Sequence, residues 1–409
     1  MTAEAAPGAL AGVRVLDLSR VLAGPWATQA LADLGATVLK VERPGAGDDT
    51  RGWGPPTLAD GSNDATYYLC ANRNKQALAI DFSRAEGADL IRRLAATADV
   101  VVENFRTGTL ARYGLDMAEL RAAHPRLVTC SVTGFGQTGP YATRAGYDFL
   151  VQGMAGLMSL TGRPDGEPGG GPLKAGVPVA DLVTGLYAAV SILAALHHAR
   201  ATGEGQHIDA GLMQSQMAVL ANHWSAYLNA GFMAPRMGNA HATVVPYRDF
   251  RAADGDLIVA VGSDSQFVKL CAILGRPDLS GDPQLATNAG RQANRARLEA
   301  ELAQSIAGWR MADLIAAMER EGVPGGPINR LDQLFADPQV AATGMVREVA
   351  RADGTRVRLV PYPHQLSATP ARVESAPPRL GEHTRAVLAR DLGLAPAQLD
   401  ALEAAGIIA

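Results

Sequence analysis

The chain has 409 residues, more than one hydrophobic core usually serves, so its length predicts two domains. Hydrophobic residues make up 47% and charged residues 19% of the sequence, which is typical of a folded globular protein and excludes extensive disorder. The formal net charge of −4 excludes a global positive field that would recruit nucleic acid or an anionic membrane, so a polyanionic ligand must be held by local cations.

The N-terminal stretch MTAEAAPGALAGVRVL lacks the basic residues and the long apolar run of a secretion signal. We also expect no uncharged apolar stretch of membrane-spanning length. The three cysteines, Cys70, Cys130 and Cys271, are widely spaced and form no CxxC pair, which gives no support for a metal site or a disulfide framework. These features predict a cytoplasmic protein.

Strand-like and helix-like segments alternate through the first half of the chain. Strands are expected at 13–18, 37–42, 78–82, 100–102 and 127–132, with a helix opening at Gly24-Pro25 and further helices near 84–97 and 116–123. Strands that alternate with helices of this length predict βαβ units and a parallel sheet. The fold class is therefore α/β.

The second half changes character along its length. A loop rich in Gly and Pro at 161–176 precedes a long apolar helix at 181–200, predicted to be buried on most faces, and a second helix near 211–229. A hairpin around Asp254-Gly255 and helices near 265–275, 292–307 and 311–321 predict a smaller α+β domain. Prolines between 361 and 378 predict an extended connection before two short terminal helices. We assign residues 1–225, completed by 331–409, to a large domain and residues 226–330 to the small one.

Common catalytic motifs are missing. The chain has no GxGxxG or GxxxxGK[ST] loop, no HExxH metal motif and no GxSxG elbow. Zinc and serine-hydrolase mechanisms therefore have no anchor in this sequence.

Asp181 stands at the start of the long apolar helix, and two interpretations are open. An aspartate at this position commonly caps a helix N-terminus. The same position gives the carboxylate help from the helix dipole in a partly apolar setting, which suits a nucleophile. Local sequence alone favours the cap, although the two roles are compatible.

Basic residues follow successive predicted strands. Arg43 comes after the strand TVLKVE, Arg73 and Lys75 lie in NRNK, and Arg106 and Arg112 follow VVVENF. Ligands of open α/β sheets bind outside the carboxyl ends of the strands, so these cations are expected to converge on one anion. For each residue taken alone, a solvated surface arginine is an equally good interpretation.

A family resemblance enters at these segments. Seven segments, in the family's order and from about residue 10 to the C-terminus, together resemble family III CoA-transferases. They are GVRVLDLSRVLAGPWATQALADLGATVLKVERPGAGDDTR, NRNK, VVENFRTGTLARYGLD, SVTGFGQTGP, RAGYDFLVQGMAG, VPVADLVTGLYA and GVPGGPIN. ERPGAGDDTR, YYLCANRNK, RAGYD and AHATVVPY look most like the branch that uses succinyl-CoA and dicarboxylates. The resemblance implies a Rossmann-like large domain, a small domain and two chains interlocked as a homodimer.

The resemblance also implies site residues. Asp181 in VADLVTG matches the family's catalytic aspartate, which would carry the acyl group and then CoA. Coenzyme A or acyl-CoA is implied as a substrate, with no permanently bound cofactor and no metal. The positions that match the family's CoA contacts are Leu22, Ala23, Arg43, Ile80, Asp81, Phe82, Asn104, Phe105, Arg106, Arg112, Ala145, Gly146, Tyr147 and Asp148.

Two departures narrow the implied activity. VGSDSQF at 261–267 replaces the glycine-rich lid of the formyl-CoA enzymes, which argues against oxalate. Tyr147 stands where related acyl-CoA racemases carry a histidine, and a phenol is a poor exchange base at neutral pH. A racemase and a non-catalytic CoA-binding module remain as alternatives. For a dicarboxylate acceptor, Arg20, Arg73 and His241 are the candidates to bind the distal carboxylate, since each lies in a segment shared with that branch.

Overall fold

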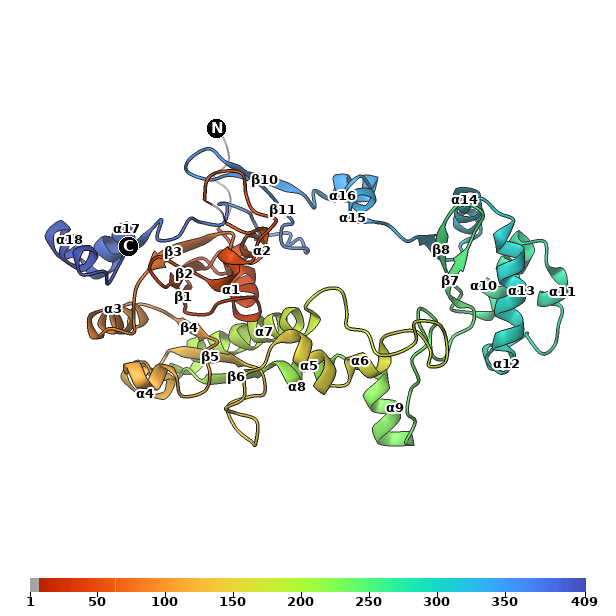
Figure 1. The fold of residues 1–409 in the computed structure, drawn as a ribbon, viewed down its shortest axis with the longest axis horizontal. Helices are drawn as coiled ribbons and strands as arrows, with labels where there is room; N and C mark the ends of the chain where they lie inside the picture. The colour runs from red at the N-terminus through yellow and green to blue at the C-terminus, as the bar shows by residue number, and fades with distance from the viewer. Residues whose placement is uncertain (1–6, 63) are drawn as a thin grey trace. The chain divides into compact units, whose positions relative to one another are not determined.

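The computed structural model describes residues 7–62 and 64–409, which form two compact units (Figure 1). Unit 1 contains the chain to Leu157, Ala175–Trp224 and Val340–Ala409, and unit 2 contains Met158–Lys174 and Ser225–Gln339. Residues 158–174, which include most of the Gly- and Pro-rich loop predicted at 161–176, and residues 331–339 were assigned to the large domain but group with unit 2.

Unit 1 is built on six parallel strands in the order β3-β2-β1-β4-β5-β6. They are β1 (Arg14–Asp17), β2 (Thr37–Glu42), β3 (Lys75–Ala79), β4 (Val100–Glu103), β5 (Val128–Thr133) and β6 (His207–Gly211). The helices of this unit are α1 (Ala23–Asp33), α2 (Thr66–Leu69), α3 (Ala85–Ala95), α4 (Met117–Ala123), α5 (Asp148–Met154), α7 (Val179–Thr202), α8 (Leu212–Ala218), α17 (Thr384–Leu392) and α18 (Pro396–Ala404), with 3-10 turns η1 (Asp49–Gly52) and η2 (Leu110–Tyr113) and the hairpin β10 (Arg347–Ala350) and β11 (Arg356–Leu359). The predicted α/β class with a parallel sheet is confirmed.

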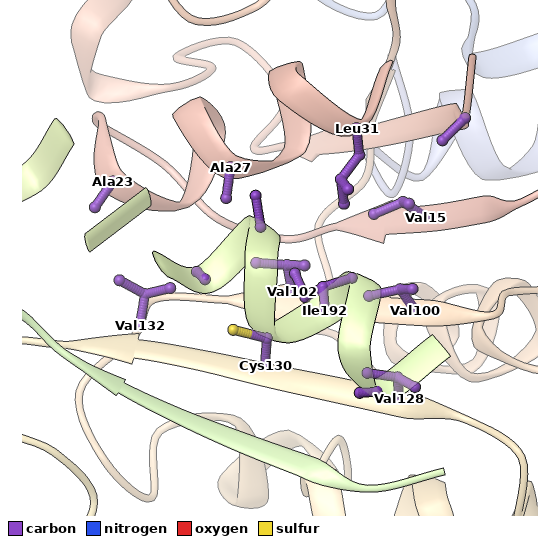
Figure 2. Close-up of a cluster of buried hydrophobic side chains, with 14 of the residues drawn as sticks. Val15, Ala23, Ala27, Leu31, Val100, Val102, Val128, Cys130, Val132 and Ile192 are labelled. Atoms are coloured by element: carbon purple, nitrogen blue, oxygen red, sulfur yellow. The ribbon is translucent and has the colours of Figure 1, made fainter. Parts of the chain in front are cut away.

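Helices cover both faces of the sheet because successive strand residues point to opposite sides. Val100 and Val102 of β4 join one core with α1 and α7, whereas Val101 joins a second core with α3, α4, α17 and α18. Figure 2 shows the first core, in which Ile192 of α7 lies among strand valines and residues of α1. Parallel strands buried on both faces account for their continuous apolar runs.

Three predictions about unit 1 need correction. β3 spans 75–79 rather than 78–82, since the backbone already pairs with β2 from Lys75 onward, and the buried Lys75 side chain forms an ion pair with Asp17. β6 was not predicted, since HIDAG alternates weakly. The helix expected at 211–229 is broken into α8 and α9 (Asn222–Ala230), with Ala221 between them at φ 47°.

Helix α7 is less buried than its composition predicts. One side packs on α1 and the sheet, but Leu186, Tyr187 and Val190 remain 51%, 48% and 63% exposed. By length and composition alone, this helix could cross a membrane, so the prediction that no stretch reaches that length is wrong. Its packing in the first core of unit 1 accounts for its apolar character equally well.

Unit 2 is a small α+β unit. The predicted hairpin is β7 (Tyr247–Arg251) and β8 (Asp256–Ala260), which β9 (Gly325–Pro327) extends to three antiparallel strands. Its helices are α10 (Asp264–Ile273), α11 (Pro277–Ser280), α12 (Asn288–Ala293), α13 (Arg295–Ala307), α14 (Met311–Glu321) and α15 (Leu331–Phe335), while α6 (Leu157–Leu160), α9 and α16 (Pro338–Thr343) lie at the points where the chain passes between units. Its own core includes Leu257, Val259 and Phe267.

Candidate active site

The loops after β1 and β4 meet at the carboxyl edge of the sheet. These strands are neighbours, yet the chain continues from β1 to one side of the sheet and from β4 to the other, so a crevice opens between the two loops. The Arg20 N–H donates to the Asn104 Oδ1 at 2.9 Å, and the Asn104 Nδ2 donates to the Arg20 carbonyl at 2.6 Å. This reciprocal pair holds the two loops together at the position where open α/β sheets bind ligands.

The backbone between β1 and α1 is strained at Val21, which has φ 69°. A β-branched residue rarely adopts this left-handed conformation, and such strain persists where the surroundings impose it. The Asp48 carboxylate accepts a hydrogen bond from the Val21 N–H at 3.2 Å, and Lys40 holds that carboxylate at 2.8 Å. The strained turn delivers the chain to Leu22, where α1 begins without a side-chain cap.

Asp181 is the third residue of α7 rather than its N-cap. The cap position is Pro178, which offers no side-chain hydrogen bond. Instead the Asp148 Oδ1, from the first residue of α5, accepts from the Ala180 N–H at 2.8 Å and from the Asp181 N–H at 3.4 Å. The capping interpretation of Asp181 is therefore wrong, and the carboxylate of Asp181 is left available for chemistry.

Two close backbone approaches place Asp181 beside these loops. A Cβ on Gly185 would lie 2.6 Å from the Ala23 carbonyl oxygen, so α7 contacts the first turn of α1 one helical turn after Asp181. A Cβ on Gly146 would lie 2.4 Å from the Gly134 Cα, where the chain before α5 crosses the chain after β5. Glycine at both positions permits contacts that any side chain would block.

The environment of Asp181 disfavours its charged form. Burial and, to a smaller extent, the nearby Asp148 carboxylate raise the pKa of Asp181 to about 7. Burial and, to a smaller extent, the charge of Asp181 raise the pKa of Tyr67 on α2 to about 12. Sequence reasoning missed Tyr67. Its only signal was the segment YYLCANRNK, which carries no motif of its own.

Two cavities adjoin each other at Arg20 and Phe105, which line both. One, of about 150 Å³, contains Asp181 and is lined by the predicted residues Leu22, Ala23, Asn104, Phe105, Arg106, Ala145, Gly146 and Tyr147. The other, of about 310 Å³, is lined by the predicted residues Arg43, Ile80, Asp81, Phe82 and Phe105. We name them the Asp181 cavity and the Arg43 cavity.

Of the residues that the family resemblance implied as CoA contacts, Asp148 and Arg112 line neither cavity. Asp148 acts through the α7 backbone, as described above. Arg112 lies exposed on η2, and only its neighbour Tyr113 lines the Arg43 cavity. Its side chain in this structure therefore gives no support for a phosphate contact.

The candidates for a distal carboxylate lie in different environments. Arg73 is buried and makes a two-pronged ion pair with Asp33 at 2.5 and 3.0 Å, so its charge is already used. His241 lies in unit 2, where its ring Nδ1 accepts from two backbone N–H groups. Arg20 lines both cavities and pairs with Asp49.

Sequence reasoning missed Arg144, which lines the Asp181 cavity. Its guanidinium lies 4.6 Å from the centre of the Tyr141 ring and 5.4 Å from that of Phe135. Within the described part of the chain it makes no ion pair. Arg144 is the first residue of the segment RAGYD, whereas the family resemblance implied contacts only for its last four residues.

No group of three or more His, Cys, Asp or Glu side chains in residues 7–62 and 64–409 is arranged to hold a metal ion. Cys130 and Cys271 are buried, and burial raises the pKa of Cys271 to about 11.

Residues 10–384 match the model of CoA-transferase family III. A succinate–glutarate CoA-transferase of Agrobacterium fabrum is 51% identical over 383 residues, covering 93% of this chain and 95% of the relative. The human succinyl-CoA:glutarate CoA-transferase is 40% identical over 399 residues, covering 98% and 90%. The crystal structure of a CAIB/BAIF family protein from Brucella suis superposes with a TM-score of 0.85 at 47% identity, covering 94% of this chain and all of that one.

Proposed function

Because the chain belongs to CoA-transferase family III, we propose that it moves CoA from succinyl-CoA to a short free dicarboxylate such as glutarate, with Asp181 as the group that carries the intermediates. The observation that carries this proposal is the carboxylate of Asp181 beside the crevice between β1 and β4, released from capping by Asp148. The names of the Agrobacterium and human relatives pair succinate or succinyl-CoA with glutarate, which supports this substrate class.

The two adjoining cavities suggest how CoA lies. The Arg43 cavity offers Arg43, the aromatic ring of Phe82 and a larger volume, which suits the nucleotide end and its phosphates. The smaller Asp181 cavity would then receive the pantetheine end with the thioester and the acceptor acid. Binding energy from the long CoA tail would position two weak nucleophiles.

The reaction has four steps. The Asp181 carboxylate attacks the donor thioester carbonyl, the C–S bond breaks, and an aspartyl–acyl anhydride and CoA thiolate form. The thiolate then attacks the aspartyl carbonyl, which releases the donor acid and leaves an aspartyl-CoA thioester. The acceptor carboxylate attacks this thioester to give a second anhydride and thiolate, and the thiolate finally takes the new acyl group and frees Asp181. Each step exchanges one activated acyl bond for another, so the cycle consumes no redox cofactor.

Residues around Asp181 would support these steps. The nucleophile is the ionised carboxylate, and a pKa of about 7 leaves a substantial ionised fraction at neutral pH with little solvent to strip away. The first turn of α1, which has no side-chain cap and borders the Asp181 cavity at Leu22 and Ala23, is a source of backbone N–H groups for the tetrahedral oxyanions.

Charge in the Asp181 cavity supports a dicarboxylate. Arg106 and Arg144 both line it and make no ion pair with the described residues, whereas pantetheine is uncharged. The far carboxylate of a dicarboxylate stays ionised in a closed pocket and needs such a cation. A monocarboxylate of equal length would leave the cation unpaired and should be a much poorer acceptor. Equal kcat/KM for glutarate and valerate with succinyl-CoA as donor would remove the dicarboxylate claim.

Exposed apolar side chains support a homodimer, which we propose to be interlocked as the family resemblance implies. Leu186, Tyr187 and Val190 on α7 lie exposed, as do Phe149 and Leu150 on the contacting helix α5. Surfaces of this kind usually mark an interface. An interlocked dimer separates only by unfolding, so a folded monomer detected by light scattering over a thousand-fold dilution would contradict it. We further propose that the enzyme works in the cytoplasm, without a bound cofactor and without nucleic-acid or membrane partners.

The decisive test is Asp181→Ala. It should abolish transfer between succinyl-CoA and glutarate while CoA binding, measured by calorimetry, persists. Wild-type enzyme incubated with succinyl-CoA and then hydroxylamine should be modified on the peptide that contains Asp181. Sustained turnover by the alanine variant would eliminate the mechanism. Solvent deuterium entering the acyl chain without net CoA transfer would instead identify a racemase.

A further inference from the structure

A third cavity, of about 250 Å³, borders the same loop as the two CoA cavities. Arg106 and Thr107 also line the Asp181 cavity, and Thr109 also lines the Arg43 cavity. The remaining walls come from the ends of β4 and β5, from β6 and from the start of α4, all within unit 1. The proposed transfer reaction uses none of these other walls.

One side chain that lines this cavity carries an unsatisfied donor. Arg121 of α4 lines it, and its Nε is buried without a hydrogen-bond partner among the described residues. His207 of β6 shares a hydrogen bond between its Nδ1 and the Thr129 hydroxyl at 2.9 Å. Arg121 and His207 line the same cavity, and burial and then the charge of Arg121 lower the pKa of His207. A buried guanidinium N–H without an acceptor is costly, which makes an anion the natural complement.

The acidic side chains of the cavity already have partners inside the protein. The Glu103 Oε2 accepts from the Phe105 N–H at 2.7 Å, and burial raises the pKa of Glu103 to about 7, which reduces its negative charge at neutral pH. The Asp116 carboxylate accepts from two backbone N–H groups in the first turn of α4, at 2.8 and 3.3 Å. Arg121 and Arg106 make no ion pair with the described residues, so their N–H groups remain available to an anion.

We propose that this cavity is a second anion site, which binds a compact oxyanion through Arg121 and His207, with Arg106 at its rim. A guanidinium presents its N–H groups in a fork that matches the oxygens of phosphate or carboxylate. The volume admits a small anion. Inorganic phosphate and a free dicarboxylate share this chemistry, and either could be the ligand in the cell.

The experiment titrates the full-length enzyme, saturated with CoA so that its own phosphate contacts are filled, with inorganic phosphate by calorimetry. Arg121→Gln should weaken phosphate binding about ten- to hundred-fold, the effect of losing a charge-assisted pair. Arg121→Lys keeps the positive charge but loses the forked pair of N–H donors, so its affinity for phosphate should lie between those of the wild type and Arg121→Gln. Arg126→Gln is the matched control, because it removes the same charge from an exposed residue outside the cavity and should leave the affinity unchanged.

A parallel titration with glutarate distinguishes phosphate from a dicarboxylate as the ligand. The ligand is the anion that binds more tightly to the wild type and loses affinity in Arg121→Gln. Crystals of the CoA complex soaked in selenate should show an anomalous peak within hydrogen-bonding distance of Arg121. Failure of wild-type enzyme to bind either anion, equal affinities in wild type and Arg121→Gln, or equal losses in Arg121→Gln and Arg126→Gln would overturn the proposal. If Arg121→Gln does not fold, the lysine variant and the selenate position decide in its place.

Discussion

Replacing Asp148 by Asn should separate two effects of this residue on Asp181. The Asn side-chain carbonyl can still accept from the Ala180 N–H, which now bonds at 2.8 Å, so α7 keeps a cap. The negative charge beside Asp181 is lost. The Gln152 Nε2, which donates to the Asp148 Oδ2 at 2.6 Å, would face an amide N–H₂ and must rotate. We expect this rearrangement to cost about 0.5–2 kcal/mol of stability, as weakened caps do.

The charge effect is visible in the pH profile. Burial is the larger cause of the raised pKa of Asp181 and Asp148 the smaller, so the variant should recover less than half of the rise from 3.8 to about 7. Because the ionised carboxylate is the nucleophile, activity rises with pH through this pKa. The acid limb of kcat/KM for succinyl-CoA should therefore move to lower pH by about 0.5–1.5 units.

The assay measures kcat/KM for succinyl-CoA between pH 5 and 9 in the wild type, in Asp148→Asn and in Asp89→Asn. Asp89 is an exposed residue of α3, so its variant controls for the loss of one negative charge elsewhere. Titration of the CoA phosphates affects all three enzymes equally. An acid limb that stays in place while kcat/KM falls evenly at every pH would show that Asp148 serves only as a cap.

Three further predictions concern the same site. Since the folded state raises the pKa of Asp181 to about 7, ionisation of this residue lowers the stability of the protein as pH rises from about 4 to 7. In denaturant titrations at pH 8, Asp181→Asn should therefore have a free energy of unfolding that exceeds the wild-type value by at most about 4 kcal/mol. This difference should vanish below pH 4. Gly185→Ala forces α7 away from α1 and should lower stability by about 1–3 kcal/mol and reduce kcat. Gly176→Ala, with open space around its Cβ, should change neither stability nor kcat. Equal losses in the two variants would disprove the close-packing argument. Arg43→Gln should raise KM for succinyl-CoA about ten- to hundred-fold, and Arg112→Gln should change it far less, because only Arg43 lines a CoA cavity; the reverse order in steady-state assays would contradict our placement of CoA.

Much of the fold was predictable from local pattern. The strand at Thr37–Glu42 has the predicted bounds, and the hairpin around Asp254-Gly255 and the terminal helices were all expected. In each case apolar periodicity and turn residues act over a few positions and agree with the tertiary structure. β6 was missed because HIDAG is only half-buried at the edge of the sheet. Pairing with β5, which lies far away in the sequence, makes it a strand.

The site divides in the same way. Motif order in the sequence was enough to single out Asp181 and to assign the family, because those features are local and specific. Only the tertiary structure decided that Asp148, 33 positions away, caps α7 and frees the Asp181 carboxylate. It also decided that Arg73 is neutralised by Asp33 while Arg144 remains unpaired among the described residues. Charge pairing depends on which side chains meet across the fold, and neither composition nor spacing along the chain contains that information.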